Sequence, residues 1–219
     1  MASTTRDPAP ARPTIPGVFA LSAIRVIVRA PMTAEKLAKI RSCNAEYGKN
    51  GWLGIAQIWL YSDGTIAQGT AKMNDSYFNS APYNTAAWKQ MVVCQEIAHD
   101  FGLDHQDENS NNANLGSCMD YTNDPDGGAG GASSSDPANT HPNSHDYQQL
   151  DVIYGGSVSS SAGSSLPAAA QGQFNERAEW GRLVRSSADG RLQVFERDLG
   201  AGSKVLTHVV WAEPRSVRP

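Results

Sequence analysis

The stretch NTAAWKQMVVCQEIAHDFG, residues 84–102, constrains the fold of this chain more than any other. Asn84 or Thr85 is a good helix N-cap, because its side-chain oxygen accepts a hydrogen bond from the first turn. Gly102 is a good terminator, because glycine adopts a positive φ without steric cost. The sequence therefore predicts a helix over residues 85–102, followed by a sharp turn into LDHQDE.

The predicted helix has two unlike faces. At 100° per residue, Gln95 and His99 share one face with Val92. The opposite face is apolar and carries Val93, Ile97 and Phe101. The pattern predicts that the apolar face packs against the protein and that the imidazole face forms the floor of a cleft.

The spacing of the histidines is typical of a metal site. Positions 95 and 99 stand at i and i+4 on one helix face, and the turn at Gly102 brings His105 back towards them. Zinc prefers nitrogen, sulfur and carboxylate ligands in a tetrahedral arrangement, with one position left for water in catalytic sites. Glu96 would then stand beside that water as a general base. The alternative is a pair of surface histidines in a polar loop.

These residues resemble the signature of the metzincin zinc peptidases, H-E-x-x-H-x-x-G-x-x-H followed by a methionine turn. Glu96, His99, Gly102 and His105 match it, while Gln95 stands at the first ligand position. Downstream, SCMDY (117–121) resembles the Ser-x-Met-x-Tyr turn of astacin- and serralysin-like members, and HDYQQLDVIYG (145–155) resembles the last helix of matrixin-like domains. The likeness covers roughly residues 23–155.

The resemblance implies an α+β, zincin-like catalytic domain with a small twisted mixed β-sheet, an active-site helix and a Met-turn. It implies a secreted zinc metalloendopeptidase acting on peptides or proteins, with Gln95, His99 and His105 at the metal. Glu96 would be the general base, Met119 the apolar base beneath the metal, and Tyr121 the group that approaches the metal or stabilises the oxyanion. No matrixin-like cysteine motif that keeps the enzyme latent is present.

Gln95 leaves three outcomes open. Its amide oxygen, a poorer zinc donor than imidazole, binds the metal weakly; or Tyr121, Asp107 or Glu108 completes the ligand set; or the metal is absent. The retained Glu96 favours a working site, because a remnant that only binds has no use for a general base. The other hypotheses are an inactive protein that binds metal, a peptide or a partner protein, and a purely structural envelope or matrix protein.

The rest of the chain predicts further elements. Residues 24–30 and 52–61 are expected strands, 33–51 a helix and 62–64 a turn. The more polar stretch 65–73 is an expected edge strand, either solvated or of the kind that pairs with a substrate. The polar segment 106–142 is an expected loop without core residues, where Asp120, Asp124 and Asp126 are candidates for a Ca²⁺ site. NSHDYQQLDVIYGG (143–156) predicts a short capped helix.

Composition divides the chain into four parts: a tail (1–22), the peptidase-like domain (23–155), a Ser/Ala/Gly-rich linker (156–175) and a three-stranded antiparallel β-meander (176–213). The meander is too small to stand alone and is expected to dock on the main domain. His208 lies in it and is interpreted as a strand residue rather than a ligand. The five tryptophans are expected in the core or at docking surfaces.

Charge and cysteine content bound the function. A net charge of −4 and a hydrophobic fraction of 40% fit a soluble globular protein, and without a basic block the chain is not expected to bind nucleic acid. No apolar run is long enough for a transmembrane segment, and no clear signal peptide begins the chain. Of three cysteines, Cys94 and Cys118 form the favoured disulfide, with free buried thiols as the alternative. We assume a monomer.

Overall fold

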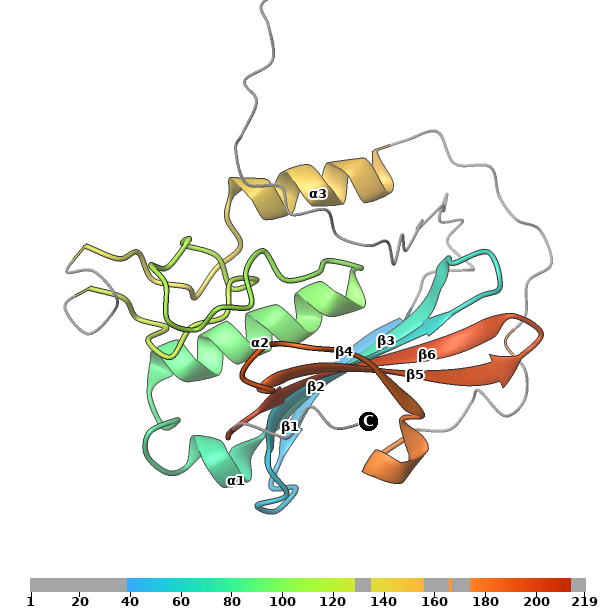
Figure 1. The fold of residues 1–219 in the computed structure, drawn as a ribbon, viewed down its shortest axis with the longest axis horizontal. Helices are drawn as coiled ribbons and strands as arrows, with labels where there is room; N and C mark the ends of the chain where they lie inside the picture. Colours follow the sequence, from blue (N-terminus) through green and yellow to red (C-terminus); the bar gives the residue numbers. More distant parts are fainter. Residues whose placement is uncertain (1–38, 129–134, 156–165, 167–173, 214–219) are drawn as a thin grey trace, which may run out of the picture.

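The computed structural model describes residues 39–128, 135–155, 166 and 174–213. Their fold is α+β, built on a mixed six-stranded sheet with the strand order β1-β3-β2-β6-β5-β4 (Figure 1). The strands are β1 (Lys39–Ala45), β2 (Trp52–Leu60), β3 (Ile66–Asn74), β4 (Arg182–Ser186), β5 (Leu192–Gly200) and β6 (Ser203–Trp211). The helices are α1 (Asp75–Phe78), α2 (Ala86–Asp100), α3 (Ser144–Tyr154) and the 3₁₀ turn η2 (Arg177–Glu179).

The predicted β-hairpin is confirmed. β2 and β3 pair in antiparallel register, with Ile58 opposite Gly69, and the connecting turn contains Gly64 at a φ of 83°. β2 is buried along its whole length, as its apolar sequence requires, because both faces of the sheet are covered.

The predicted helix over residues 33–51 is wrong in the part that the structure describes. Residues Lys39–Ala45 form strand β1, which pairs in parallel with β3. The seven residues gain backbone hydrogen bonds from the side of β3 that β2 leaves free, and this pairing outweighs the helical pattern of a short and exposed segment. β3 is consequently an interior strand, so the expectation of an edge strand over 65–73 is also wrong. The predicted tail and the strand 24–30 lie outside the described residues.

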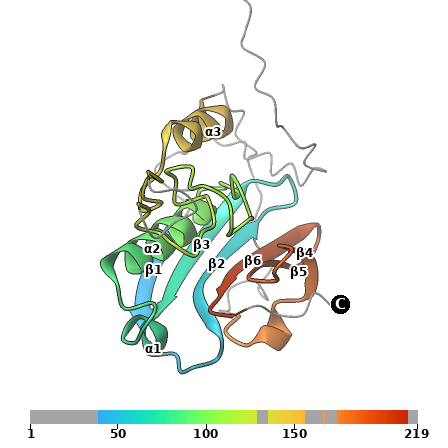
Figure 2. The same ribbon diagram turned by 60° about the vertical axis from the view of Figure 1, so that its left-hand side comes forward.

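The C-terminal meander is confirmed as three antiparallel strands, β4, β5 and β6. β6 also pairs with β2 in antiparallel register, with Leu206 opposite Ile58. The meander therefore docks by extending the sheet, and its strands form half of it (Figure 2). Most of the predicted linker lies outside the described residues, but its Phe174 packs against Trp59 with ring centroids 6.1 Å apart.

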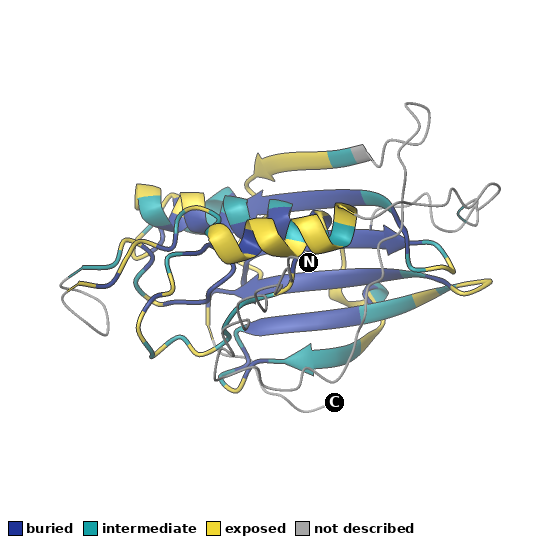
Figure 3. Ribbon diagram, turned by 90° about the horizontal axis from the view of Figure 1, so that it is seen from above, coloured by how far each residue is buried: buried dark blue, intermediate teal, exposed yellow. Residues whose placement is uncertain are grey.

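Two apolar clusters cover the two faces of the sheet. On one face, α2 packs against β2 and β3, and its Met91 and Val92 are fully buried. On the other face the cluster is aromatic and includes Trp180 and Phe195. All five tryptophans are buried, as the sequence predicts: Trp52, Trp59, Trp88, Trp180 and Trp211. Figure 3 shows the buried central strands beneath the more exposed helices.

The expected orientation of α2 is reversed. Gln95 and His99 are fully buried, whereas Phe101, expected on the packed side, is 42% exposed. The polar face fits against the sheet because small residues lie beneath it: a Cβ at Gly54 would stand 2.5 Å from Oε1 of Glu96. A Cβ at Gly69 would likewise stand 2.6 Å from Cγ of Asp100. The predicted caps are confirmed, with Thr85 accepting from the Trp88 amide and Gly102 at a φ of 87°.

The segment over residues 106–142 is a loop in its described part, as expected, but it does contain buried residues. Ser117, Asp120 and Asn139 are at most 1% exposed. The Asn139 side chain accepts from the amides of Gly116 and Ser117 and donates to Asp120, so the burial of these polar groups is compensated by hydrogen bonds. The Cys94–Cys118 disulfide, confirmed in the structure, ties this loop to α2.

α3 follows the 106–142 loop in the chain, and the structure confirms it as the predicted short helix (Figure 1). Asn143 and Asp146 form a reciprocal capping box at its start. Among the helices of the described residues, none has the length and apolar character needed to cross a membrane.

Candidate metal centre

His99 and His105 lie together where the sequence predicts. His99 ends the buried face of α2, and the turn at Gly102 returns the chain so that the two ring centroids are 4.6 Å apart. Nδ1 of His99 donates to the Leu103 carbonyl at 2.9 Å, which leaves Nε2 with the lone pair. That Nε2 and both ring nitrogens of His105 are buried and have no hydrogen-bond partner among the described residues.

A third imidazole, which the sequence analysis did not assign to the site, joins this pair. His208 lies on β6, and its ring stacks on that of His99 with centroids 4.1 Å apart and planes 26° from parallel. Its Nδ1 is buried and unpartnered within the described part of the chain. Burial lowers the pKa of His208 to about 3, and burial together with the neighbouring imidazoles lowers the pKa of His99 well below its usual value. Both rings are therefore neutral, the form that binds metal ions.

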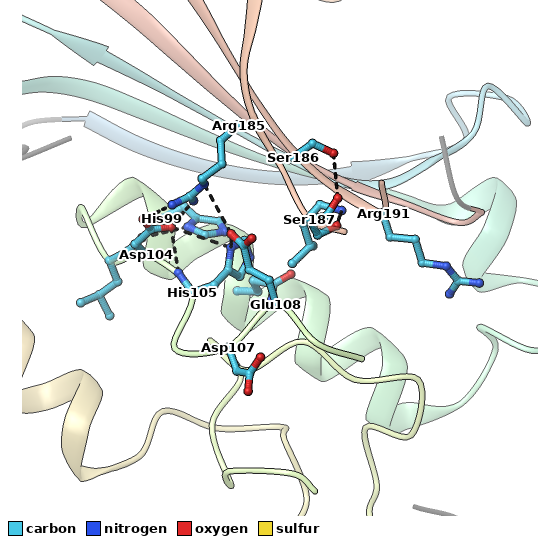
Figure 4. Close-up of polar contacts among 12 residues, drawn as sticks. His99, Asp104, His105, Asp107, Glu108, Arg185, Ser186, Ser187 and Arg191 are labelled. Carbon is cyan, nitrogen blue, oxygen red and sulfur yellow. Dashed lines mark hydrogen bonds and ion pairs between the residues drawn. The ribbon is translucent and has the colours of Figure 1, made fainter. Parts of the chain in front are cut away.

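Two carboxylates and one arginine stand beside His105. Its Nδ1 is 3.8 Å from Oδ1 of Asp104 and 3.7 Å from Oε1 of Glu108. Arg185, from β4, contacts both oxygens of Asp104 and places its Nε 3.4 Å from Oε1 of Glu108 (Figure 4). Burial alone would raise the pKa of Asp104, but the hydrogen bonds and charge of Arg185 outweigh it and hold the pKa well below its ordinary value.

A group of potential metal ligands lies around His105. Potential ligand atoms of Asp104, His105 and Glu108 lie within 4.8 Å of one another, the one such group among the described residues. Imidazole nitrogen and carboxylate oxygen are ligands that zinc accepts. Unpaired buried imidazole nitrogens have a desolvation cost, which a bound cation would offset. Asp107, a possible ligand by sequence, instead accepts from the backbone of Asn109 and lies away from the histidines (Figure 4).

Gln95 and Glu96 are both fully buried on the face of α2 that packs on the sheet. The Gln95 amide nitrogen donates to the Cys118 carbonyl at 3.1 Å, and its oxygen has no partner in the described chain. The Glu96 carboxyl lies against Gly54, and neither of its oxygens has a hydrogen-bond partner within the described ranges. Burial, reinforced by Asp100, raises the pKa of Glu96 well above its ordinary value and so disfavours its ionised form.

Met119 and Tyr121 lie in the core cluster that packs on α2. Met119 is fully buried, and its amide donates to the Ser117 hydroxyl at 2.9 Å, which shapes the predicted turn. The Tyr121 hydroxyl accepts from Arg191 at 3.4 Å, and burial raises the pKa of Tyr121 to about 12. The phenol is thus protonated, and the hydrogen bond that it accepts comes from Arg191 rather than from a histidine.

A pocket of about 340 Å³ opens beside the histidines, between the sheet and α3. His105, His208, Asp104 and Arg185 form its polar part. Its apolar wall is drawn from the sheet and α3, and includes Leu60, Ile66, Leu206 and Ile153. A largely apolar pocket with a few converging polar groups is the usual form of a small-ligand site.

The candidate calcium ligands have other contacts. Oδ2 of Asp120 accepts from the Leu115 amide and from Asn139, both at 2.8 Å, and burial raises the pKa of Asp120 to about 6. Burial and the neighbouring Asp126 raise the pKa of Asp124. Within the described ranges these three carboxylates do not converge as a ligand group, and the calcium site stays a prediction.

Comparison of the chain with protein-family models, with curated proteins and with solved structures finds no match. The metzincin resemblance therefore stays a prediction based on the residues at 96–121. Sequence reasoning missed Asp104, which directly precedes His105. It also missed His208 and Arg185, which both come from the C-terminal meander. No local pattern marks them, because their place in the site depends on the pairing of β6 with β2.

Proposed function

We infer that this protein is a zinc-dependent peptidase, with His99 and His105 as metal ligands. The observation that carries this proposal is the pair of adjacent, buried imidazoles whose Nε2 atoms have no hydrogen-bond partner in the described chain. When bound, zinc would supply a Lewis acid that polarises a carbonyl and activates water near neutral pH.

The chain's own residues would bind and orient the substrate. The pocket beside His105 is large and apolar enough to hold a hydrophobic side chain of a peptide. Leu103 holds the His99 ring through its carbonyl and so keeps Nε2 available. Glu96 is the proposed proton acceptor, and Tyr121 the proposed hydrogen-bond donor to the oxyanion.

The position of Glu96 favours a second candidate function, a protein that binds metal and peptide without hydrolysis. The Glu96 carboxyl is fully buried against Gly54, and burial raises its pKa well above the ordinary value, which opposes the ionised form that a base requires. It is also absent from the residues that line the pocket. A general base must reach the proton that it removes, so in this arrangement Glu96 has to be ionised and given access to water before it acts.

One set of variants separates these functions. The purified wild-type protein would be tested for bound metal and for cleavage of a mixed peptide library, with and without a chelator. The same measurements would be made on the variants Glu96→Gln and His99→Ala and on the control His141→Ala. His141 is an exposed histidine bonded to Gln90, so its loss should change neither property. The peptidase proposal expects chelator-sensitive cleavage, lost in Glu96→Gln with metal retained and lost together with metal in His99→Ala.

The other results have distinct meanings. Bound metal and chelator-sensitive peptide binding without cleavage would support the second candidate. Wild-type protein free of metal at neutral pH, after incubation with zinc, would refute both and leave the structural-protein hypothesis. Unchanged cleavage by Glu96→Gln would refute its role as the base.

The proposed substrate is a peptide or protein, and the proposed setting is extracytoplasmic. The Cys94–Cys118 disulfide supports this setting, because such bonds persist in oxidising compartments. A monomer is the proposed oligomeric state, which sedimentation of the purified protein would test. Mass-spectrometric titration of its thiols would test whether the disulfide that supports the extracytoplasmic setting is formed.

A further inference from the structure

The histidine stack is unusual because burial leaves several of its nitrogens without compensation. Nε2 of His99, both nitrogens of His105 and Nδ1 of His208 are all buried and make no hydrogen bond among the described residues. Of these nitrogens, Nδ1 of His105 has charged neighbours, Asp104 and Glu108, at 3.8 and 3.7 Å. A buried polar group without a hydrogen bond costs about 1–3 kcal/mol. Three such imidazoles in contact are the lining expected of a ligand-binding site.

We propose that His208 is the third imidazole ligand of the metal site, in the role that Gln95 cannot fill as well. His99, His105 and His208 together would hold one divalent transition-metal ion, of which zinc is the best match. This proposal rests on the metal site of the proposed function but requires no hydrolysis. It adds a ligand from the C-terminal meander to a site otherwise built from α2 and the loop after it.

Gln95 is the weaker candidate for chemical and geometric reasons. Its amide nitrogen already donates to the Cys118 carbonyl, so the side chain is held by the loop. Its oxygen is a neutral amide donor, whereas zinc prefers imidazole nitrogen, thiolate and carboxylate. His208, in contrast, already contacts His99 through its ring and offers an unpaired nitrogen.

Metal binding must rearrange the stack. An ion coordinated by imidazole lies close to the plane of the ring at about 2.0–2.1 Å from the nitrogen. The nitrogens of the three imidazoles do not all lie within 4.8 Å of one another in this structure. The His99 and His208 rings are only 26° from parallel with centroids 4.1 Å apart, so at least one ring has to turn before the nitrogens meet the same ion. The strand positions that flank His208 are Ala56 on β2 and Val194 on β5.

The same coordination would join distant parts of the chain. His99 belongs to α2. His208 belongs to β6, the last strand of the chain, which pairs with β2. A metal shared by the two would fasten the meander to α2, so metal binding should stabilise the folded protein.

The test uses the full-length chain, stripped of metal with a chelator and titrated with Co²⁺ and with Zn²⁺ in competition with a chromophoric chelator. The variants are His208→Phe, which keeps an aromatic ring over His99, His208→Ala, Gln95→Ala and the control His141→Ala. Absorption spectra of bound Co²⁺ report the coordination, and X-ray absorption of bound zinc counts imidazole ligands. Circular dichroism of each metal-free variant verifies folding.

Wild type should bind one ion through three imidazoles. His208→Phe should bind at least about 100-fold more weakly through two imidazoles, because loss of even an outer-shell partner of a ligand typically costs 10–100-fold. Gln95→Ala and His141→Ala should stay within about threefold of wild type. Wild-type affinity and spectra in folded His208→Phe, with weak binding in Gln95→Ala, would overturn this proposal while leaving the proposed metal site intact. Absence of any binding by wild type would overturn both.

Discussion

A glycine-to-alanine substitution beneath α2 tests whether the polar face of this helix is packed on the sheet. In the structure, a Cβ at Gly54 would lie 2.5 Å from Oε1 of Glu96 and 2.6 Å from Cγ1 of Val92. Both distances are far below ordinary van der Waals contact, and Gly54 lies within β2 and is not among the positive-φ glycines. Gly54→Ala therefore acts by crowding and not by backbone strain.

The expected magnitude follows from that crowding. Extra methyl groups in a well-packed core typically cost about 1–3 kcal/mol. For a chain of this size each kcal/mol lowers the melting temperature by about 2–4 °C. Thermal unfolding of the metal-free protein by circular dichroism should thus show Gly54→Ala melting about 2–12 °C below wild type.

A double-mutant cycle gives the sharper result. Glu96→Ala removes two of the three closest contacts of the added methyl group, Oε1 and Cγ of Glu96, so the cost of Gly54→Ala should be smaller in that background. Gly48→Ala is the control, because its Cβ meets open space and only the positive φ of 84° opposes it. Wild-type stability of Gly54→Ala, or costs that simply add in the double mutant, would show that α2 presents a different face to β2.

Two further predictions concern the loop and its attachment. Cys94→Ala/Cys118→Ala should lose about 3.5 kcal/mol, because the disulfide closes a loop with a sequence separation of 24, and denaturant unfolding that matches wild type would contradict this estimate. Asp120 has its pKa raised from 3.8 to about 6 chiefly by burial, so its contribution to stability is complete below about pH 4 and is lost as the pH rises through 6. This contribution amounts to about 3 kcal/mol at most, and Asp120→Asn should flatten the stability profile between pH 4 and 7. An unchanged profile would show that another group titrates.

Local patterns in the sequence predicted many of the elements. The caps of α2, the turn at Gly102, the β2–β3 hairpin, the meander and α3 are each specified by residues a few positions apart, and the structure confirms them. The Cys94–Cys118 pairing and the proximity of His99 to His105 also follow from neighbouring segments. The proposed roles of Glu96 and Tyr121 rest on the family resemblance and stay predictions.

The sequence by itself determined which segments are helices and strands wherever period, cap and turn chemistry act within one element. Only the tertiary structure decided that residues 39–45 pair with β3, because a free strand edge supplies hydrogen bonds that no local pattern encodes. It also decided which face of α2 is buried, since that depends on Gly54 and Gly69 in separate strands. Finally, the pairing of β6 with β2 placed His208 against His99, a contact between residues far apart in the chain that neither segment specifies alone.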